Sequence, residues 1–481
     1  MSSDAKLKEL GSGRIMPLLL KLSWPALVSM TLNALYVVVD RFYIGQGCGQ
    51  DSMAGLTLAM PLIIGISAFG PLIGVGHGAL ISIKLGQKDH ATAEKLLGEM
   101  VALKIVFFLL ITPLVFLNID PILAISGGAK VSAAALSDAV LYMKITVFSH
   151  IFSHLAFGLS NTMRAEGAAR QSMFCIIAGF LVNMVLDPLF IFVFGWGVAG
   201  AAWATVISMF ASCISALWYY LAGKPSVKMR LCRMRIYPDL CLRALSIGLG
   251  PFLQQICSSF VNISLNLAFG KWAPSRDAAT MQIASAGIFQ ITLLMFFLPL
   301  MGIQQGVGPI IGFNWGARNY ARVREAALKG LVFSTAVVTF ACAVFIFCPE
   351  ILARCFANPK SGAALIVQSS KDLRIANCML WCIGLNVLAT TYFQSIGKPA
   401  VSITLSLMRQ VLCLMPCIWI LPYFFEDASL GVWLSMPVSD VLACLATAVP
   451  FYLHMRFLNR ANVIRENRAS GNRSQKSRQQ V

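Results

Sequence analysis

Two aspartates, Asp40 and Asp187, interrupt segments of the sequence that are otherwise apolar. Asn33 and Tyr36 precede Asp40 at spacings that place all three on one face of a helix. Asn183 stands one helical turn before Asp187. A charged side chain at the centre of a membrane-spanning helix costs about 2.5–3.5 kcal/mol on insertion scales, so each carboxylate needs a partner or a function. These residues are therefore the first candidates for an ion-binding site.

The two aspartates are expected at similar depths in the outer half of the membrane. Counted from the outer ends of their spans, Asp40 is about 7 Å deep and Asp187 about 10 Å deep, at 1.5 Å of rise per residue. Thr205 lies at a comparable depth in the next span. If the three spans are neighbours, their oxygen atoms converge. The cluster is then a site for a proton, which burial and like charge favour, or for Na⁺. The candidate sodium ligands are Asp40, Asn183, Asp187 and Thr205.

Prolines interrupt the helices that carry both aspartates. Pro188 directly follows Asp187 and leaves the carbonyl of Met184 without its helical donor. Pro25 weakens the first span below Asp40 and is a candidate bending point.

Asp440 is the third acid that we place deep in the membrane, and it differs from the other two. It lies in the last apolar run beside Ser435 and Ser439, in the half of the chain with no other deep acid. We expect it to be structural and paired with Arg409 of the preceding run, with substrate contact as the alternative.

The whole sequence is far more apolar than a soluble protein. Hydrophobic residues make up 58% of the 481 residues and charged residues 12%, against about 25% charged in soluble domains. This composition excludes a soluble enzyme, a disordered protein and a coiled coil. A helix needs about 20 apolar residues to cross a bilayer. We predict an all-α polytopic membrane protein with twelve spans, at 16–44, 56–82, 97–118, 136–158, 171–194, 198–222, 241–269, 280–311, 327–348, 372–394, 402–424 and 430–455.

The net charge of +18 marks orientation in the membrane. Of the 38 Lys and Arg residues, 27 fall on the side that holds both termini and six on the other side. Cytoplasmic loops carry an excess of Lys and Arg. We therefore predict cytoplasmic termini and a multi-pass protein of the plasma or inner membrane. No nucleic-acid partner is needed to explain the basicity.

The chain contains an internal repeat with an offset of 230 residues. An even number of spans separates the copies, so two six-span halves have the same orientation, which is typical of a transporter. We predict lobes at 1–222 and 241–458, a basic loop at 223–240, and a basic tail at 459–481 that is disordered. The matched residues are Gly76, Gly78, Ile81, Gly86 and Ala91 with Gly306, Gly308, Ile311, Gly316 and Ala321.

Other catalytic and metal-binding patterns are absent from the sequence. It has no Walker A or GxSxG motif, and His150 and His154 lack the glutamate of an HExxH zinc site. The 14 cysteines form no CxxC pair. We predict that the chain is not an enzyme and needs no cofactor beyond a coupling ion.

Several stretches together resemble the MATE (multidrug and toxic compound extrusion) family, and most closely its DinF-like and MepA-like branch. The resemblance spans nearly the whole chain. It implies two six-helix lobes around a central cavity, alternating access, and efflux of organic cations or amphiphilic drugs driven by inward H⁺ or Na⁺. Separately, we expect a monomer. The matching stretches are 36–45, 76–86, 161–167, 183–192, 197–205, 306–316, 409–411, 431–433 and 437–440.

The resemblance also implies roles for single residues. The cation site of that branch maps to Tyr36, Asp40, Asn183, Asp187 and Thr205, the kink-forming proline to Pro25, and a further match to Asn161. Another branch carries acids in spans 7 and 10, where this sequence has Gln254, Gln255, Asn377 and Asn386 instead. A second-lobe sodium site is not expected, but Gln254, Gln255 and Gln282 are candidates for substrate contact.

Two alternative functions remain. One is a flippase for a lipid-linked cell-envelope precursor, which would be expected to have more spans and several buried arginines. The other is a polytopic membrane enzyme, which would need a cluster of His, Asp and Glu that the sequence lacks.

Overall fold

The computed structural model describes residues 3–125, 132–223, 225–356 and 362–479, which form helices joined by loops and contain no strand. The helices of the first half are α1 (Ser3–Ser12), α2 (Ile15–Gly47), α3 (Gly49–Gly86), α4 (His90–Leu117), α5 (Ile119–Ile125), α6 (Ala133–Thr146), α7 (Ser149–Ala165), α8 (Ala169–Pro188) and α9 (Gly197–Ala222). Those of the second half are α10 (Pro238–Trp272), α11 (Arg276–Gly316), α12 (Tyr320–Phe347), α13 (Pro349–Phe356), α14 (Gly362–Asn377), α15 (Ile383–Ser395), α16 (Pro399–Leu407), α17 (Met415–Ile420) and α18 (Ala428–Gln479).

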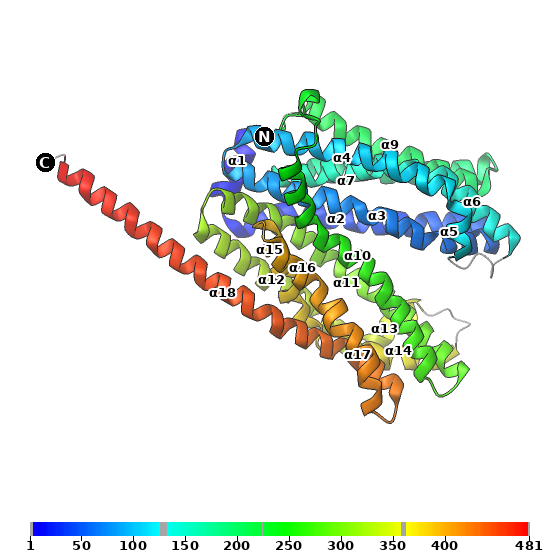
Figure 1. Ribbon diagram of the computed structural model, residues 1–481. Coiled ribbons are helices and arrows are strands. Elements are labelled where there is room, and N and C mark those ends of the chain that lie inside the picture. The colour runs from blue at the N-terminus through cyan, green and yellow to red at the C-terminus, as the bar shows by residue number, and fades with distance from the viewer. Residues whose placement is uncertain (1–2, 126–131, 224, 357–361, 480–481) are drawn as a thin grey trace.

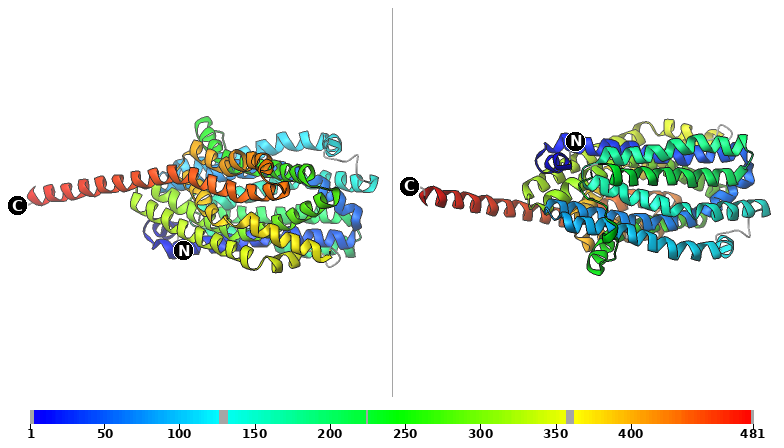
Figure 2. Two further views of the ribbon diagram at one scale, coloured as in Figure 1. Left: turned by 90° about the horizontal axis from the view of Figure 1, so that it is seen from below. Right: turned by 90° about the horizontal axis from the view of Figure 1, so that it is seen from above.

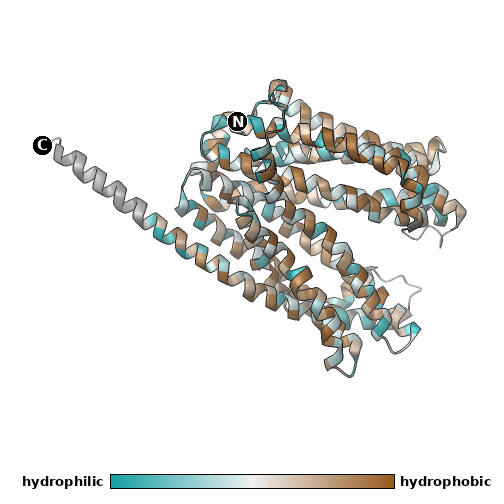
Figure 3. Ribbon diagram, viewed as in Figure 1, coloured by the Kyte–Doolittle hydropathy of each residue, from teal (hydrophilic) through white to brown (hydrophobic). Residues whose placement is uncertain are grey.

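The number of spans agrees with the prediction. In the described part of the chain, ten helices are long and apolar enough to cross a membrane, and two bent helix pairs bring the number to twelve. The bent pairs are α6 with α7, at 53°, and α14 with α15, at 40°. Figure 3 shows hydrophobic residues along most of the length of the helices, and many large apolar side chains are exposed on the outside, as a lipid-facing surface requires.

The helices form two groups, α2–α9 and α10–α18. Figure 1 shows that the groups meet at the end that carries α1 and diverge toward the other end. We call the meeting end, formed by α1 and the C-terminal ends of α3 and α11, the termini face. In both views of Figure 2 the last part of α18 projects beyond this face.

The repeated glycines lie where the two lobes cross at the termini face. A Cβ added at Gly86 would lie 1.9 Å from the Phe313 carbonyl oxygen, and one added at Gly316 would lie 2.0 Å from that of Ile83. Both pairs differ by the repeat offset, so the contact between α3 and α11 is two-fold symmetric. Only glycine allows two helix backbones to approach this closely. We call this crossing the glycine seam.

A second pair of repeat positions extends the seam. Gly76 of α3 packs on α10, where an added Cβ would lie 1.9 Å from the Ala244 carbonyl oxygen. Gly306 of α11 packs on α2, where an added Cβ would lie 2.8 Å from the Ser23 nitrogen. The repeat therefore marks the joint between the lobes.

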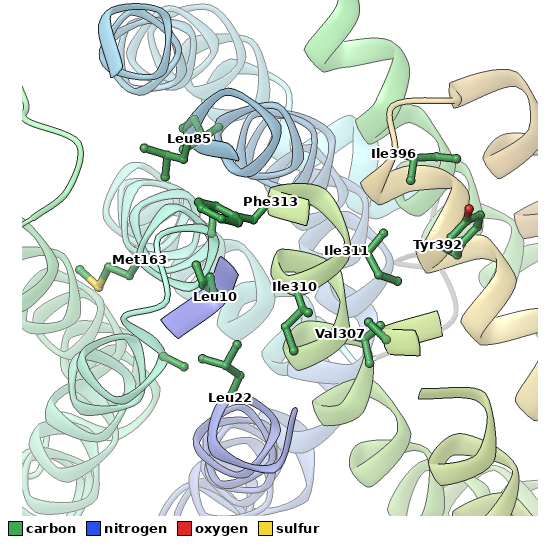
Figure 4. Close-up of a cluster of buried hydrophobic side chains, with 14 of the residues drawn as sticks. Leu10, Leu22, Leu85, Met163, Val307, Ile310, Ile311, Phe313, Tyr392 and Ile396 are labelled. Atoms are coloured by element: carbon green, nitrogen blue, oxygen red, sulfur yellow. The ribbon is translucent and has the colours of Figure 1, made fainter. Parts of the chain in front are cut away.

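The short helix α1 lies across this joint. The carbonyl of Leu10 accepts hydrogen bonds from Asn314 Nδ2 at 3.0 Å and from Arg322 Nη2 at 3.3 Å, and both donors belong to the second lobe. Figure 4 shows the Leu10 side chain beside Met163 of the first lobe and Phe313 of the second, within one apolar core. The N-terminal segment thus belongs to the core of the termini face.

On the first-lobe side, α1 meets a buried acid at the end of α7. Lys6 Nζ donates to Tyr219 Oη at 3.0 Å, and Tyr219 Oη donates to Glu166 Oε1 at 2.7 Å. Glu166 Oε2 accepts from the backbone nitrogens of Ser226 at 2.6 Å and Val227 at 3.1 Å. Glu166 thereby ties the loop between the lobes to α7. Burial raises the pKa of Glu166 to about 7, and burial lowers the pKa of Lys6.

This raised pKa predicts a pH dependence of stability. Between its ordinary value of 4.5 and about 7, the folded protein holds a proton on Glu166 that the unfolded chain has released. The free energy of unfolding therefore falls as pH rises through this window, by up to about 3 kcal/mol. Glu166→Gln removes this contribution. The thermal midpoint of the wild type minus that of Glu166→Gln should therefore decrease as the pH rises from about 5 to about 7.5. Glu325→Gln, at an exposed acid, should give no such trend. A pH-independent difference at position 166 would contradict the prediction.

Some predicted boundaries differ from the structure. Helix α10 begins at Pro238, three residues earlier than the expected lobe boundary, because proline is favoured in the first helical turn. The tail after Asn459, expected to be disordered, continues as helix α18 to Gln479. No proline follows Pro450 in the sequence to end that helix.

Candidate functional site

The spans that carry the predicted polar cluster are neighbours. Helix α2 packs against α8 and α9, and α8 packs against α9. Tyr36 Oη of α2 donates a hydrogen bond to Thr205 Oγ1 of α9 at 3.1 Å. Within α8, Asn183 Nδ2 donates to Asp187 Oδ1 at 3.0 Å. The structure therefore brings the residues of all three spans together.

Both carboxylates of this cluster are buried and incompletely paired. Asp40 is 6% exposed and Asp187 is fully buried. Among the described residues, Asp40 Oδ1 and Asp187 Oδ2 have no hydrogen-bond partner. The two acids are close enough to repel each other electrostatically. Two such oxygen atoms beside hydroxyl and amide groups can hold a proton or a small monovalent cation.

Tyr142 of α6 is a member of this cluster that sequence reasoning missed. Its side chain is 6% exposed and interacts with Asp40 and Thr205. No spacing rule pointed to Tyr142, because it lies on the short first half of a span that bends between Thr146 and Ser149. A search for polar side chains at the expected depth in every span would have found it.

A cavity of about 380 Å³ adjoins the cluster. Asn33 and Tyr36 line it, and Tyr36 therefore connects the cavity to Thr205 of the cluster. Side chains of α2, α3, α7, α8 and α9 form most of its wall, and Gln255 of α10 is the contribution of the second lobe. The cavity therefore lies mainly within the first lobe, and its volume is in the range typical of small-molecule sites.

The other candidates for substrate contact lie apart from this cavity. Gln282 Oε1 accepts a hydrogen bond from Trp433 Nε1 at 2.7 Å inside the second lobe. Gln254 is exposed and does not line the cavity. Asn161 Oδ1 accepts from Arg164 Nη2 at 2.9 Å, and it is Arg164 that lines the cavity. Pro25 is buried within α2, which continues from Ile15 to Gly47.

The second lobe contains a separate ion pair. Arg409 Nε lies 2.6 Å from Asp440 Oδ1, and Asp440 is 2% exposed. Asp440 Oδ2 has no hydrogen-bond partner among the described residues. The pair joins the π-helical segment Met408–Leu414 to α18 and neutralises both charges.

Asp372 is a buried acid of span 10 that the sequence analysis did not recognise. We placed the start of this span at 372, but its first helical half begins at Ala363, so Asp372 lies inside. Its Oδ2 accepts from Ser285 Oγ at 2.6 Å and its Oδ1 from Gln368 Nε2 at 2.9 Å. The expectation that span 10 lacks a deep acid is therefore wrong. The charged residues Lys371, Asp372 and Arg374 interrupt the apolar run and hid the true start of the span.

Comparisons with known proteins identify relatives over most of the chain. The MatE family model matches residues 25–189 and 252–420. The multidrug export protein MepA of Staphylococcus aureus strain N315 is 26% identical over 432 residues, which cover 90% of this chain and 92% of MepA.

Solved structures share the fold. A structure of the MATE multidrug transporter DinF-BH, solved as a complex, is 30% identical, with a TM-score of 0.81, and the match covers 91% of this chain and 95% of that one. An outward-facing multidrug resistance MATE transporter of the MOP superfamily is 22% identical, with a TM-score of 0.84 and coverage of 92% and 96%.

Proposed function

The chain belongs to the MATE family of membrane transporters, and from this premise we propose that it exports organic cations and amphiphilic drugs in exchange for inward H⁺ or Na⁺. Membership makes it a multi-pass transporter and not an enzyme. MepA is a multidrug export protein and DinF-BH a multidrug transporter, and we extend that activity to this chain.

One observation supports the proposed exchange of drug for an ion. Two buried carboxylates, each with an unpartnered oxygen among the described residues, belong to a cluster whose Tyr36 lines the cavity and donates a hydrogen bond to Thr205. An ion that binds Asp40 or Asp187 changes the charge beside the cavity and so weakens binding of a cationic drug. Because linkage is reciprocal, a bound drug also lowers affinity for the ion. The site residues that we propose for coupling are Asp40, Asp187, Asn183, Tyr36 and Thr205.

Transport further requires that the cavity open alternately to the two sides. We propose that the termini face is cytoplasmic, as the distribution of Lys and Arg favours. The glycine seam closes that face in this structure, and the lobes would rock about it to face inward. Ion uptake from outside then releases drug, and the emptied protein reloads from the cytoplasm.

A reconstituted transport assay tests this function. Purified protein in liposomes loaded with ethidium should release or accumulate the dye according to an imposed pH or sodium gradient, with each gradient applied alone. We expect at least one gradient to drive flux well above that of empty liposomes. If neither does, and a lipid-linked precursor is scrambled instead, the protein is a flippase and the proposal fails.

A further inference from the structure

Three acids of the first lobe hold the basic segment that connects the two lobes. Glu94 Oε2 of α4 lies 2.6 Å from Arg233 Nη1. Glu99 Oε1, also of α4, accepts a hydrogen bond from the backbone nitrogen of Tyr237 at 2.6 Å. Glu166 accepts two further backbone hydrogen bonds from the same segment. The positively charged chain that follows span 6 is therefore fastened to the first lobe by carboxylates of the protein itself.

The second lobe has no acid at the equivalent positions. There the repeat offset of 230 places Arg324, Lys329 and Ile396. The neighbouring Glu325 is exposed and already pairs with Lys329 at 2.6 Å. The chain that follows span 12 is also basic, but these positions offer it no carboxylate. It continues instead as α18, which projects beyond the termini face (Figure 2).

Positive charge is therefore exposed where α18 leaves the second lobe. Lys398, Arg456 and Arg460 are all exposed, and no carboxylate among the described residues lies within ion-pair distance of them. Lys398 stands at the start of α16, close enough to His454 of α18 to interact with it electrostatically. The three charges thus belong to neighbouring elements, and we call them the α18 patch.

Exposed apolar side chains adjoin the α18 patch on the side of the membrane span. Tyr452, Leu453 and Phe457 are 60%, 59% and 52% exposed. The guanidinium carbon of Arg456 lies 5.7 Å from the centroid of the Tyr452 ring, and Arg460 follows one helical turn later on the same face. Aromatic side chains followed by basic ones are typical of the boundary between membrane and water. An acyl chain can therefore lie along the apolar residues while its headgroup meets the arginines.

We propose that the α18 patch binds the headgroups of anionic phospholipids in the adjoining leaflet. The phosphodiester oxygens accept hydrogen bonds from Arg456 and Arg460, whose planar guanidinium groups match phosphate geometry, and Lys398 adds a third positive charge. A lipid with a net negative charge is favoured over a zwitterionic one, because the choline of phosphatidylcholine offsets the attraction of its phosphate. This inference goes beyond the export function and does not depend on it.

A lipid titration of the full-length protein in a neutral detergent tests this site. The thermal midpoint is the readout, since a ligand that binds the folded protein raises it. In the wild type, phosphatidylglycerol should reach half of its effect at a concentration at least about tenfold below that of phosphatidylcholine. Arg456→Gln/Arg460→Gln should weaken phosphatidylglycerol binding by more than about tenfold, because each basic residue near anionic lipid contributes about fivefold. Glycerol 3-phosphate, which has no acyl chains, should give no shift at the same concentrations.

Two further double variants separate the site from net charge. Arg230→Gln/Arg233→Gln removes the same charge where Glu94 already neutralises it, and should keep the preference for phosphatidylglycerol. Arg456→Lys/Arg460→Lys keeps the charge and should retain most of the preference. Equal effects of both lipids on the wild type, an equal loss of preference in both Gln variants, or an equal shift with glycerol 3-phosphate would overturn the proposal. Failure of gradient-driven ethidium flux would refute the export function separately and would not affect this result.

Discussion

Asp40→Asn is expected to abolish gradient-driven drug export while the protein stays folded. The asparagine side chain has nearly the same volume but cannot exchange a proton and binds Na⁺ only weakly. The Asp40 side chain is 6% exposed, with one oxygen unpartnered among the described residues, so the substitution breaks no hydrogen bond at that atom. We expect the initial rate of ethidium flux under a pH or sodium gradient to fall at least about tenfold, since the ion step supplies the driving force.

Asp187→Asn should behave in the same way, because its carbonyl oxygen can still accept the hydrogen bond from Asn183. Asp120→Asn, at an exposed acid in α5, is the control and should transport normally. The thermal midpoint of each variant separates loss of coupling from loss of fold. Export by Asp40→Asn at the wild-type rate would remove Asp40 from the coupling site.

Gly86→Ala is expected to reduce export by more than about tenfold, although it adds a single methyl group. The new Cβ would lie 1.9 Å from the Phe313 carbonyl oxygen, where backbone atoms of both helices must move apart. Closely packed interfaces do not absorb such overlap without repacking. The glycine seam should then fail to close, and the cavity should no longer be sealed at the termini face.

The two-fold relation of the seam supplies a second, equivalent test. Gly316→Ala meets the Ile83 carbonyl oxygen at 2.0 Å and should give the same loss. Gly65→Ala, on the same helix α3 as Gly86, has no described atom within 4 Å of its new Cβ and is the matched control. Ethidium flux from liposomes measures all three. If Gly86→Ala transports as fast as Gly65→Ala, the seam is not needed for the transport cycle.

The polar cluster around Asp40 and Asp187 could be located from the sequence, because the sequence shows both the depth of a residue in its span and its helical spacing. Asp40 and Asp187 are rare acids in long apolar runs, and the rise per residue gives their depth. Asn183 follows from its spacing to Asp187, and Thr205 from its depth in the next span. The sequence does not show which side chains in the cluster are hydrogen-bonded to each other, for example that Tyr36 donates a hydrogen bond to Thr205.

Residues on broken spans were harder to find. Tyr142 and Asp372 both lie on the first half of a bent pair, so their position relative to the other spans depends on the bend. The two positions are related by the repeat offset of 230, so one structural feature accounts for both omissions. A hydropathy window assumes one continuous helix and cannot recognise such a break.

The sequence shows the repeat that marks the joint between the lobes, but it does not show that the repeated residues contact each other. The offset of 230 identified Gly86 and Gly316 as equivalent, yet sequence similarity does not say that equivalent residues touch each other. Helix α1 was missed because it is short and polar, with Lys6 and Lys8 among its residues. Its place depends on Asn314 and Arg322, about 300 residues away, which no local pattern encodes.

The central claim is that the coupling ion and the drug compete through Asp40 and Asp187. Its most direct test is the equilibrium dissociation constant for ethidium, measured on purified protein between about pH 8 and pH 6 and, separately, from near zero to about 0.1 M NaCl. For the wild type we predict that at least one ion raises this constant about tenfold, within the usual range of allosteric coupling. In the double variant Asp40→Asn/Asp187→Asn the constant should not depend on either ion. A wild-type constant that neither ion changes, or a double variant that keeps the wild-type dependence, would contradict the claim.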